Sequence, residues 1–155
     1  MAACTMLILM AAACGKNEDD DIIWDIANFK IEIQVVNGQG QNVTSQVASM
    51  APKAVWNGKT YELNANRKQV NVAARTRALM AVFEGLFTDE GRLYFGELSG
   101  SDTYQDATLV IQWGDGTSNE IKFNHELVWK DNEPIFNQSF WLDGKRVNKI
   151  VITKK

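Results

Sequence analysis

Cysteine and histidine are scarce in this chain of 155 residues, and each shortage excludes a class of chemistry. Both cysteines, Cys4 and Cys14, lie at the very start of the chain. The remainder therefore has no disulfide framework, no cysteine zinc site and no thiol nucleophile. The single histidine, His125, excludes any site that requires two imidazole groups.

The sequence also has little net charge and no apolar run of membrane-spanning length. Its 16 basic and 19 acidic residues give a net charge of -3, and no basic stripe with interleaved aromatic residues is present. A nucleic-acid partner is therefore not expected. The longest apolar stretch covers about 13 residues, whereas a transmembrane helix requires roughly 20. The chain length indicates one domain.

The start of the chain has the composition of a secretion signal. The wholly apolar residues 6–10 are followed by Ala11-Ala12-Ala13 and then by Cys14. A short apolar run that ends in small residues is typical of a signal that a peptidase removes. The alternative is an apolar N-terminal helix of a cytoplasmic protein. A polar, acidic stretch directly after the cysteine argues against such a core segment.

The segment Ala11-Ala12-Ala13-Cys14 resembles the lipobox of bacterial lipoproteins. Alanine stands at position 11, where that family usually has leucine, and no Lys or Arg precedes the apolar run. The resemblance implies cleavage before Cys14, diacylglycerol on its sulfur and a fatty acyl chain such as palmitate on the new amino group. Chains of this kind anchor a protein firmly in a membrane, because each buried methylene contributes about 0.8 kcal/mol.

An acidic tether follows the cysteine. Glu18-Asp19-Asp20-Asp21 repel one another and stay solvated. The stretch resembles the export signal of surface lipoproteins of Bacteroidota; a plain linker or a chance calcium ligand is the alternative. The implied organisation is a signal peptide over residues 1–13, a lipidated cysteine with its tether over residues 14–27 and a domain over residues 28–155. The implied location is the outer membrane, with the domain exposed at the cell surface.

The domain has the pattern of short strands separated by turns. Phe29, Ile31, Ile33 and Val35 alternate with polar residues, which predicts a strand with one buried face. Asn57-Gly58 between apolar segments predicts a tight hairpin, because both residues tolerate positive φ. Residues 79–87 are predicted to form a buried strand or a helix, and the turn residues 89–92 with the following residues 93–95 predict a hairpin. Further strands are predicted around residues 109–113, 121–129, 140–142 and 150–152, with a turn at Asp143-Gly144.

These segments predict an all-β fold, an antiparallel β-sandwich of about 8–9 strands. Short helical turns are expected within residues 46–50 and 73–81. Pro52 and Pro134 are expected between strands, where a missing N–H does not interrupt a ladder. With the signal and the tether, the pattern resembles small Bacteroidota lipoproteins with immunoglobulin-like or transthyretin-like sandwiches. That resemblance assigns a role to no residue except Cys14.

The stretch Trp113-Gly114-Asp115-Gly116-Thr117 is similar to a turn of PKD-like immunoglobulin-fold domains. The two glycines permit a tight turn, and the Asp115 carboxylate can accept backbone N–H groups across it. A calcium loop that combines Asp115 with Asp102 or Asp106 is the alternative. Calcium requires six to eight oxygen ligands, so a structural turn is favoured.

No enzyme is expected, and no catalytic residue, metal site or cofactor is assigned. His125 follows Phe123 on the same strand face and has no partner motif, so a structural or exposed role is favoured over that of a general base. Carboxylates such as Glu84, Glu97, Asp102 and Asp106 could pair as in glycosidases only across a cleft that sequence cannot reveal. The basic residues Arg67, Lys68, Arg75 and Arg77 form no contiguous patch.

The five tryptophans are expected to divide between the core and the exposed surface of the domain. Trp113 and Trp129 share the buried alternation of their strands and are expected in the core. Trp56, beside a hairpin tip, and Trp141 are expected to be exposed and are the candidate ligand-binding aromatics. Trp24 precedes the domain.

Two functions follow as hypotheses. One is a membrane-anchored binding or adhesion module whose partner at the cell surface is a glycan or a protein. The other is an accessory subunit of an outer-membrane assembly, of glycan-uptake or fimbrial type, that pairs through an edge strand.

Overall fold

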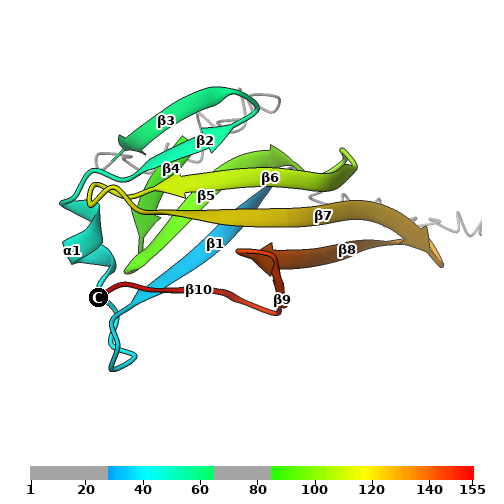
Figure 1. The fold of residues 1–155 in the computed structure, drawn as a ribbon. Helices are drawn as coiled ribbons and strands as arrows, with labels where there is room; N and C mark the ends of the chain where they lie inside the picture. The colour runs from blue at the N-terminus through cyan, green and yellow to red at the C-terminus, as the bar shows by residue number, and fades with distance from the viewer. Residues whose placement is uncertain (1–27, 65–84) are drawn as a thin grey trace, which may run out of the picture.

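A computed structural model describes residues 28–64 and 85–155, and within them the fold is all-β (Figure 1). This confirms the predicted fold class. One short helix, α1 (Thr44–Ala48), lies where a helical turn was expected. The strands of the described part are β1 (Asn28–Val36), β2 (Lys53–Trp56), β3 (Lys59–Asn64), β4 (Gly85–Asp89), β5 (Arg92–Ser99), β6 (Tyr104–Gln112), β7 (Ser118–Lys130), β8 (Glu133–Leu142), β9 (Lys145–Val147) and β10 (Ile150–Thr153).

The strands form a single sheet in the order β10-β1-β5-β4-β3-β2-β6-β7-β8-β9. The sheet curls so that its two halves face each other over one core, which makes the fold sandwich-like (Figure 1). The prediction of purely antiparallel pairing was wrong for two strand pairs, because β10 runs parallel to β1 and β4 runs parallel to β3. Parallel neighbours require a long connection, and both pairs join strands that are distant in sequence.

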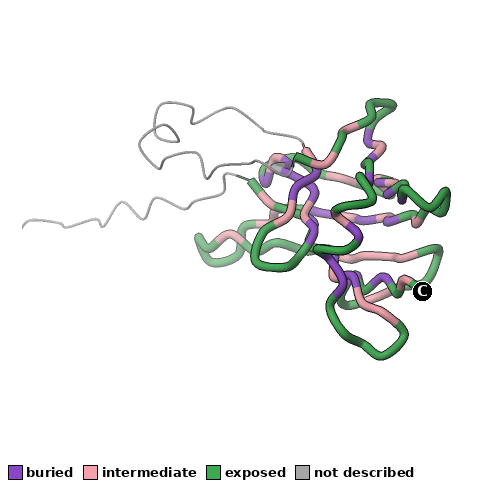
Figure 2. The backbone as a smooth tube through the Cα atoms, turned by 90° about the vertical axis from the view of Figure 1, so that its left-hand side faces the viewer, coloured by how far each residue is buried: buried purple, intermediate pink, exposed green. Residues whose placement is uncertain are grey.

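The core is built from strand residues that alternate with exposed or half-buried ones. In β1, Ile31, Ile33 and Val35 are buried between exposed or half-buried polar residues, as predicted. The same period of two buries Leu109 and Ile111 in β6. Figure 2 shows the buried stretches inside the molecule and the exposed ones at the turns. The core therefore forms where apolar faces of both sheet halves meet.

Two-residue turns connect four of the hairpins in the described part. Asn57 and Gly58 both have positive φ, which matches the primed turns that suit the twist of paired strands. The turns at Glu90-Gly91 and Asp143-Gly144 repeat this geometry. The turn between β7 and β8 does so with Asp131 and Asn132, at φ values of 52° and 64°, without any glycine.

One proline lies where none was expected. Pro52 directly precedes β2, but Pro134 is the second residue of β8 and pairs with Trp129 of β7. The ladder tolerates it because β8 is an edge strand at this point, with no described neighbour on its outer side. The prediction that Pro134 falls between strands was wrong for that reason.

Among the described residues, no helix is long and apolar enough to cross a membrane.

Candidate functional site

The β7–β8 hairpin extends beyond the body of the molecule (Figure 1). Strand β6 begins at Tyr104, which pairs with His125, so β7 continues past that point with β8 as its described neighbour. On the other side, β9 pairs with Phe140, Trp141 and Leu142 only. Residues 126–137 therefore form a two-stranded projection, which we call the arm.

The arm carries most of the large apolar side chains that are exposed. Within the described residues these are Met50, Trp129, Ile135, Phe136 and Val151. Three of the five lie on the arm: Trp129 is 55% exposed, Phe136 44% and Ile135 39%. Trp129 and Phe136 lie on one face of the arm and Ile135 on the other, and exposed apolar surface of this kind on a small domain is typical of an interaction site.

The apolar surface of the arm continues the core face of the sheet. On β7, Ile121, Phe123 and His125 point into the core by alternation, and Leu127 and Trp129 follow on the same face. Their partners on β8 are Phe136 and Pro134. The pattern of a buried strand therefore runs past the point where the opposite half of the sandwich can cover it.

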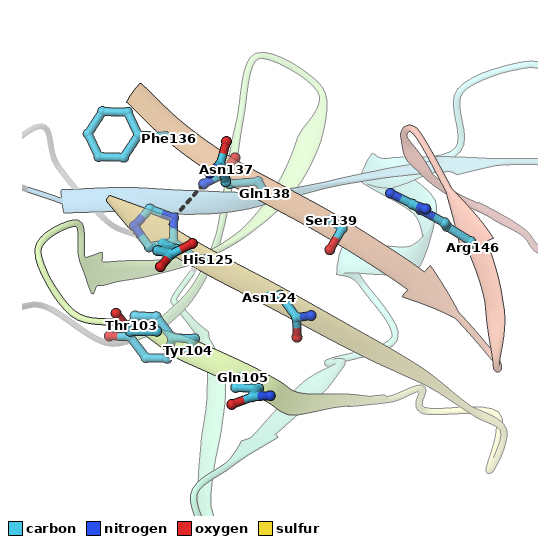
Figure 3. A pocket seen from close by; sticks show the side chains of 11 residues that line it. Thr103, Tyr104, Gln105, Asn124, His125, Phe136, Asn137, Gln138, Ser139 and Arg146 are labelled. Atoms are coloured by element: carbon cyan, nitrogen blue, oxygen red, sulfur yellow. Dashed lines mark hydrogen bonds between the residues drawn. The ribbon is translucent and has the colours of Figure 1, made fainter. Parts of the chain in front are cut away.

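His125 fixes the base of the arm (Figure 3). Its ring is fully buried, and Nε2 lies 2.9 Å from the backbone oxygen of Gly100 in the β5–β6 loop. Nδ1 accepts a hydrogen bond of 2.9 Å from the Gln138 side-chain amide on β8. Since an amide N–H only donates, this geometry assigns the proton of a neutral ring to Nε2, which donates to Gly100.

The same ring joins two aromatic groups. His125 stacks on Phe29 with ring centroids 4.1 Å apart and contacts Phe136 at 5.5 Å. The ring is therefore hydrogen-bonded at both nitrogens and packed against two aromatic rings. This arrangement supports the structural reading of His125 over that of a general base.

An open groove of about 640 Å³ runs along the base of the arm (Figure 3). Its lining combines carboxamides and hydroxyl groups with one carboxylate, one guanidinium, one imidazole and one phenyl ring. Arg146 of β9 borders it, with the guanidinium carbon 5.9 Å from the centre of the Trp141 ring. The lining residues are Thr103, Tyr104, Gln105, Asn124, His125, Glu126, Phe136, Asn137, Gln138, Ser139 and Arg146.

Two of the tryptophan predictions were wrong. Trp56 was expected at the surface but is 3% exposed, stacked on Phe123 with centroids 5.5 Å apart. It follows buried Ala54 by two residues, so alternation turns it inward despite the adjacent turn. Trp129 was expected in the core but lies on the arm, where β7 extends beyond the opposite half of the sheet.

The other tryptophans agree better with the sequence. Trp113 is buried, and its indole N–H donates to the Asn119 side chain at 2.7 Å. Trp141 is half-buried and shares its sheet face with Lys122, its partner on β7, and with Arg146. The two candidate ligand-binding aromatics, Trp56 and Trp141, therefore do not form one exposed surface. Trp24 lies outside the described residues.

Asp115 is part of a structural turn. One carboxylate oxygen accepts hydrogen bonds from the Thr117 backbone N–H and hydroxyl, at 2.9 and 2.6 Å. The other oxygen lies 2.6 Å from the Lys154 ammonium at the end of β10. The lysine, followed by the two Thr117 groups, holds the pKa of Asp115 well below its ordinary value. This carboxylate thus ties the β6–β7 turn to the C-terminal strand.

The described residues contain no group of three or more His, Cys, Asp or Glu side chains placed to hold a metal ion. Asp102 and Asp106 are exposed, and Asp106 lies 3.5 Å from the Lys122 ammonium. Glu84 and the side chain of Glu97 lie outside the described part of the structure, as do Cys14, the acidic tether, the helical turn expected within residues 73–81 and the basic residues Arg67, Lys68, Arg75 and Arg77.

The arm was not predicted from the sequence. The alternation of residues 121–129 gave the correct face for each side chain but not the length of the neighbouring strands. No local pattern marks it, because apolar residues stand side by side at residues 127–129, 135–136 and 140–142, where a period of two would alternate them with polar ones. Strands of 13 and 10 residues exceed the 9 of β6 and cannot be covered along their whole length.

Comparison of the chain with known protein families, with curated proteins and with solved structures finds no match in any of the three. The functional argument therefore depends on the geometry of this molecule alone.

Proposed function

We propose that this protein is a lipid-anchored cell-surface module that binds a partner polypeptide by strand addition at the arm. The observation that carries the proposal is the outer edge of β8 at residues 133–139, which pairs with no strand of the described part, beside the exposed side chains of Trp129 and Phe136. Lipid on Cys14 would keep the module at the outer membrane. The proposal covers both an adhesion module and an accessory subunit of a larger assembly.

An open strand edge is a template for another chain, because its backbone N–H and C=O groups lack partners. Proteins usually protect such edges with charges, prolines or bulges. Here the protection is confined to Glu133 and Pro134 at the turn, and residues 135–139 carry no charge. Backbone hydrogen bonds would supply affinity, and the apolar side chains of the arm would supply burial.

Site-specific crosslinking in intact cells tests this proposal. A photoreactive phenylalanine analogue at position 129 should form a covalent adduct with a polypeptide, and the same analogue at exposed Lys59 on the β2–β3 hairpin should not. Adding Phe136→Pro should abolish the adduct, because it removes one edge N–H and leaves the β7 ladder in place. Equal adducts at both positions, or none at position 129, would contradict the proposal.

A glycan ligand is the second candidate, and one observation favours it. The groove at the base of the arm is lined by four carboxamide side chains, of Gln105, Asn124, Asn137 and Gln138, and such groups recognise sugar hydroxyls through paired donors and acceptors. A glycan array with the wild type and with Asn137→Ala and Trp141→Ala tests it. Binding that both variants retain unchanged would exclude this face.

A further inference from the structure

We propose that the partner polypeptide encloses the arm on both faces, in an apolar cleft that is open at its far end. This inference rests on the proposed function and describes the partner that it requires. It follows from three features of the described residues: apolar side chains on both faces of the arm, charged groups at its tip, and the polar lining of the hollows on this chain.

An apolar band surrounds the arm. Three successive cross-strand pairs of the ribbon are wholly apolar, and they are Leu127 with Phe136, Val128 with Ile135 and Trp129 with Pro134. Because side chains alternate along each strand, the first and third pairs lie on the core face and the middle pair lies on the opposite face. Both faces have exposed members, since Trp129 is 55% exposed on one and Ile135 is 39% exposed on the other. The band therefore needs covering from two sides.

Exposed polar side chains bound the band at both ends. These are Glu126 and Asn137 towards the body, and Lys130, Asp131, Asn132 and Glu133 at the tip. Between them the band is about 10 Å tall, since each strand residue rises about 3.3 Å. A partner that covers the band therefore has to leave the tip in water, which requires a cleft that is open beyond the arm.

A flat surface or a lipid interior fits this distribution less well. A flat surface, of protein or of membrane, covers one face of the ribbon and leaves either Ile135 or Trp129 in water. Insertion into lipid covers both faces, but the tip would enter first. Lys130, Asp131 and Glu133 would then lie deeper than the band, in hydrocarbon, where charges are costly. A polypeptide cleft covers both faces and leaves these charges solvated.

Two hollows of the described residues are too polar to receive the arm of a second copy. The groove at the base of the arm is lined mainly by carboxamide and hydroxyl groups. A second hollow, of about 270 Å³, is bordered mainly by polar and charged side chains such as Lys30, Glu32 and Gln138. Neither provides apolar walls on two sides, which favours a different polypeptide as the partner.

Enclosure supplies packing that the arm lacks on its own. Beyond the pairing of Tyr104 with His125, β8 is the one described neighbour of β7. A two-stranded hairpin is marginally stable in water and gains stability from a further packed layer. Partner walls on the two sides would each lie about 10 Å from the ribbon, the spacing of packed sheets. The arm would then be the middle layer of three.

Crosslinking from both faces of the arm tests the enclosure. In intact cells, a photoreactive phenylalanine analogue at position 135 should capture the same polypeptide as the analogue at position 129, because the two side chains point to opposite faces. The matched control is the analogue at exposed Glu120, which lies on the same face of β7 as Val128 but within the body, where β6 pairs with it. It should capture nothing.

Polar substitution on the second face is an independent measurement. Val128→Thr and Ile135→Thr keep branched side chains but lose apolar surface on the face opposite Trp129. Each should lower the adduct yield at position 129 by roughly threefold to tenfold, because less apolar area is buried. Val110→Thr, on β6 beside Glu120, is the control and should leave the yield unchanged.

The outcomes separate the enclosure from the proposed function. An adduct at position 129 with none at position 135 overturns the enclosure and leaves strand addition standing. Unchanged yields in both threonine variants also contradict contact on the second face. Adducts of lipid mass, or of twice the chain mass, overturn the enclosure because they identify a membrane or a second copy as the occupant. No adduct at position 129 is the failure of the proposed function itself.

Discussion

Single side chains of the same type have opposite environments in this molecule. Trp56 and Trp129 both follow apolar residues in alternating segments, yet one is surrounded by core aromatics and the other projects from the arm. The indole N–H of Trp56 is buried without a hydrogen-bond partner. An unpaired donor reduces the benefit of burial, so Trp56 is held by packing alone. Its role is to fill the core.

Substitution distinguishes these two tryptophans quantitatively. Trp56→Ala should lower the free energy of unfolding by about 3–5 kcal/mol, because it leaves a large cavity beside Phe123. Trp129→Ala should change it by less than about 1 kcal/mol, since the side chain is mostly solvated. Chemical denaturation measures both values. A small loss for Trp56→Ala would show that the ring is not part of the core.

At the scale of elements, the β6–β7 turn joins three parts of the chain. Gly114 approaches the backbone of Met50 so closely that a Cβ at position 114 would overlap the Met50 carbonyl oxygen. Asp115 in the same turn binds Lys154 beyond β10. The segment after α1 and the residue that follows β10 therefore both contact this one turn.

The close approach at Gly114 predicts a steric cost. Gly114→Ala should lower the free energy of unfolding by about 1–3 kcal/mol, because the backbone of residue 50 has to move. Gly38→Ala serves as control, since a Cβ there meets nothing within 4 Å and its φ is ordinary. Thermal unfolding of both variants decides the matter, and equal melting temperatures would refute the steric role.

The lowered pKa of Asp115 predicts a pH dependence of stability. A carboxylate with a lowered pKa in the folded state contributes stability above its unfolded pKa of about 3.9, and the contribution is lost as the pH falls toward the folded value. The wild type should therefore be more stable than Asp115→Asn at pH 6, and the difference should shrink below about pH 4. Urea unfolding at several pH values measures it, with exposed Asp102→Asn as control. A difference independent of pH would exclude the Lys154 pair as its cause.

The elements show how far a sequence pattern reaches. Alternation gave the buried faces of β1, β6 and β7, and Asn57-Gly58 and Asp143-Gly144 gave two hairpin turns, because each signal is local. The turn at Asp131-Asn132 has no glycine and gave no comparable signal. The exposure of Trp129 and the open edge beside Pro134 depend on where neighbouring strands end, which no local pattern contains.

At the scale of the whole molecule, the order of the strands in the sheet could not be predicted from the sequence. The first and last strands of the described part lie side by side in parallel, and β3 meets β4 across a long connection. Pairings of this kind depend on how the sheet closes over its core. The arm then extends from one end of the body (Figure 1). Anchoring of such a domain would concentrate the molecules in two dimensions and favour weak strand pairing with other surface proteins.

The anchor is the assumption on which that concentration depends. Cys14→Ala should release the protein from the membrane fraction and abolish incorporation of labelled fatty acid, because the diacylglycerol and the amino-linked acyl chain would both be attached to that residue. Cys4→Ala is the matched control, since Cys4 lies in the segment expected to be removed, and it should change neither result. Mass spectrometry of the native protein provides a separate check. An unmodified chain that still begins at Met1 would refute the anchor and leave the arm without the proximity that membrane attachment provides.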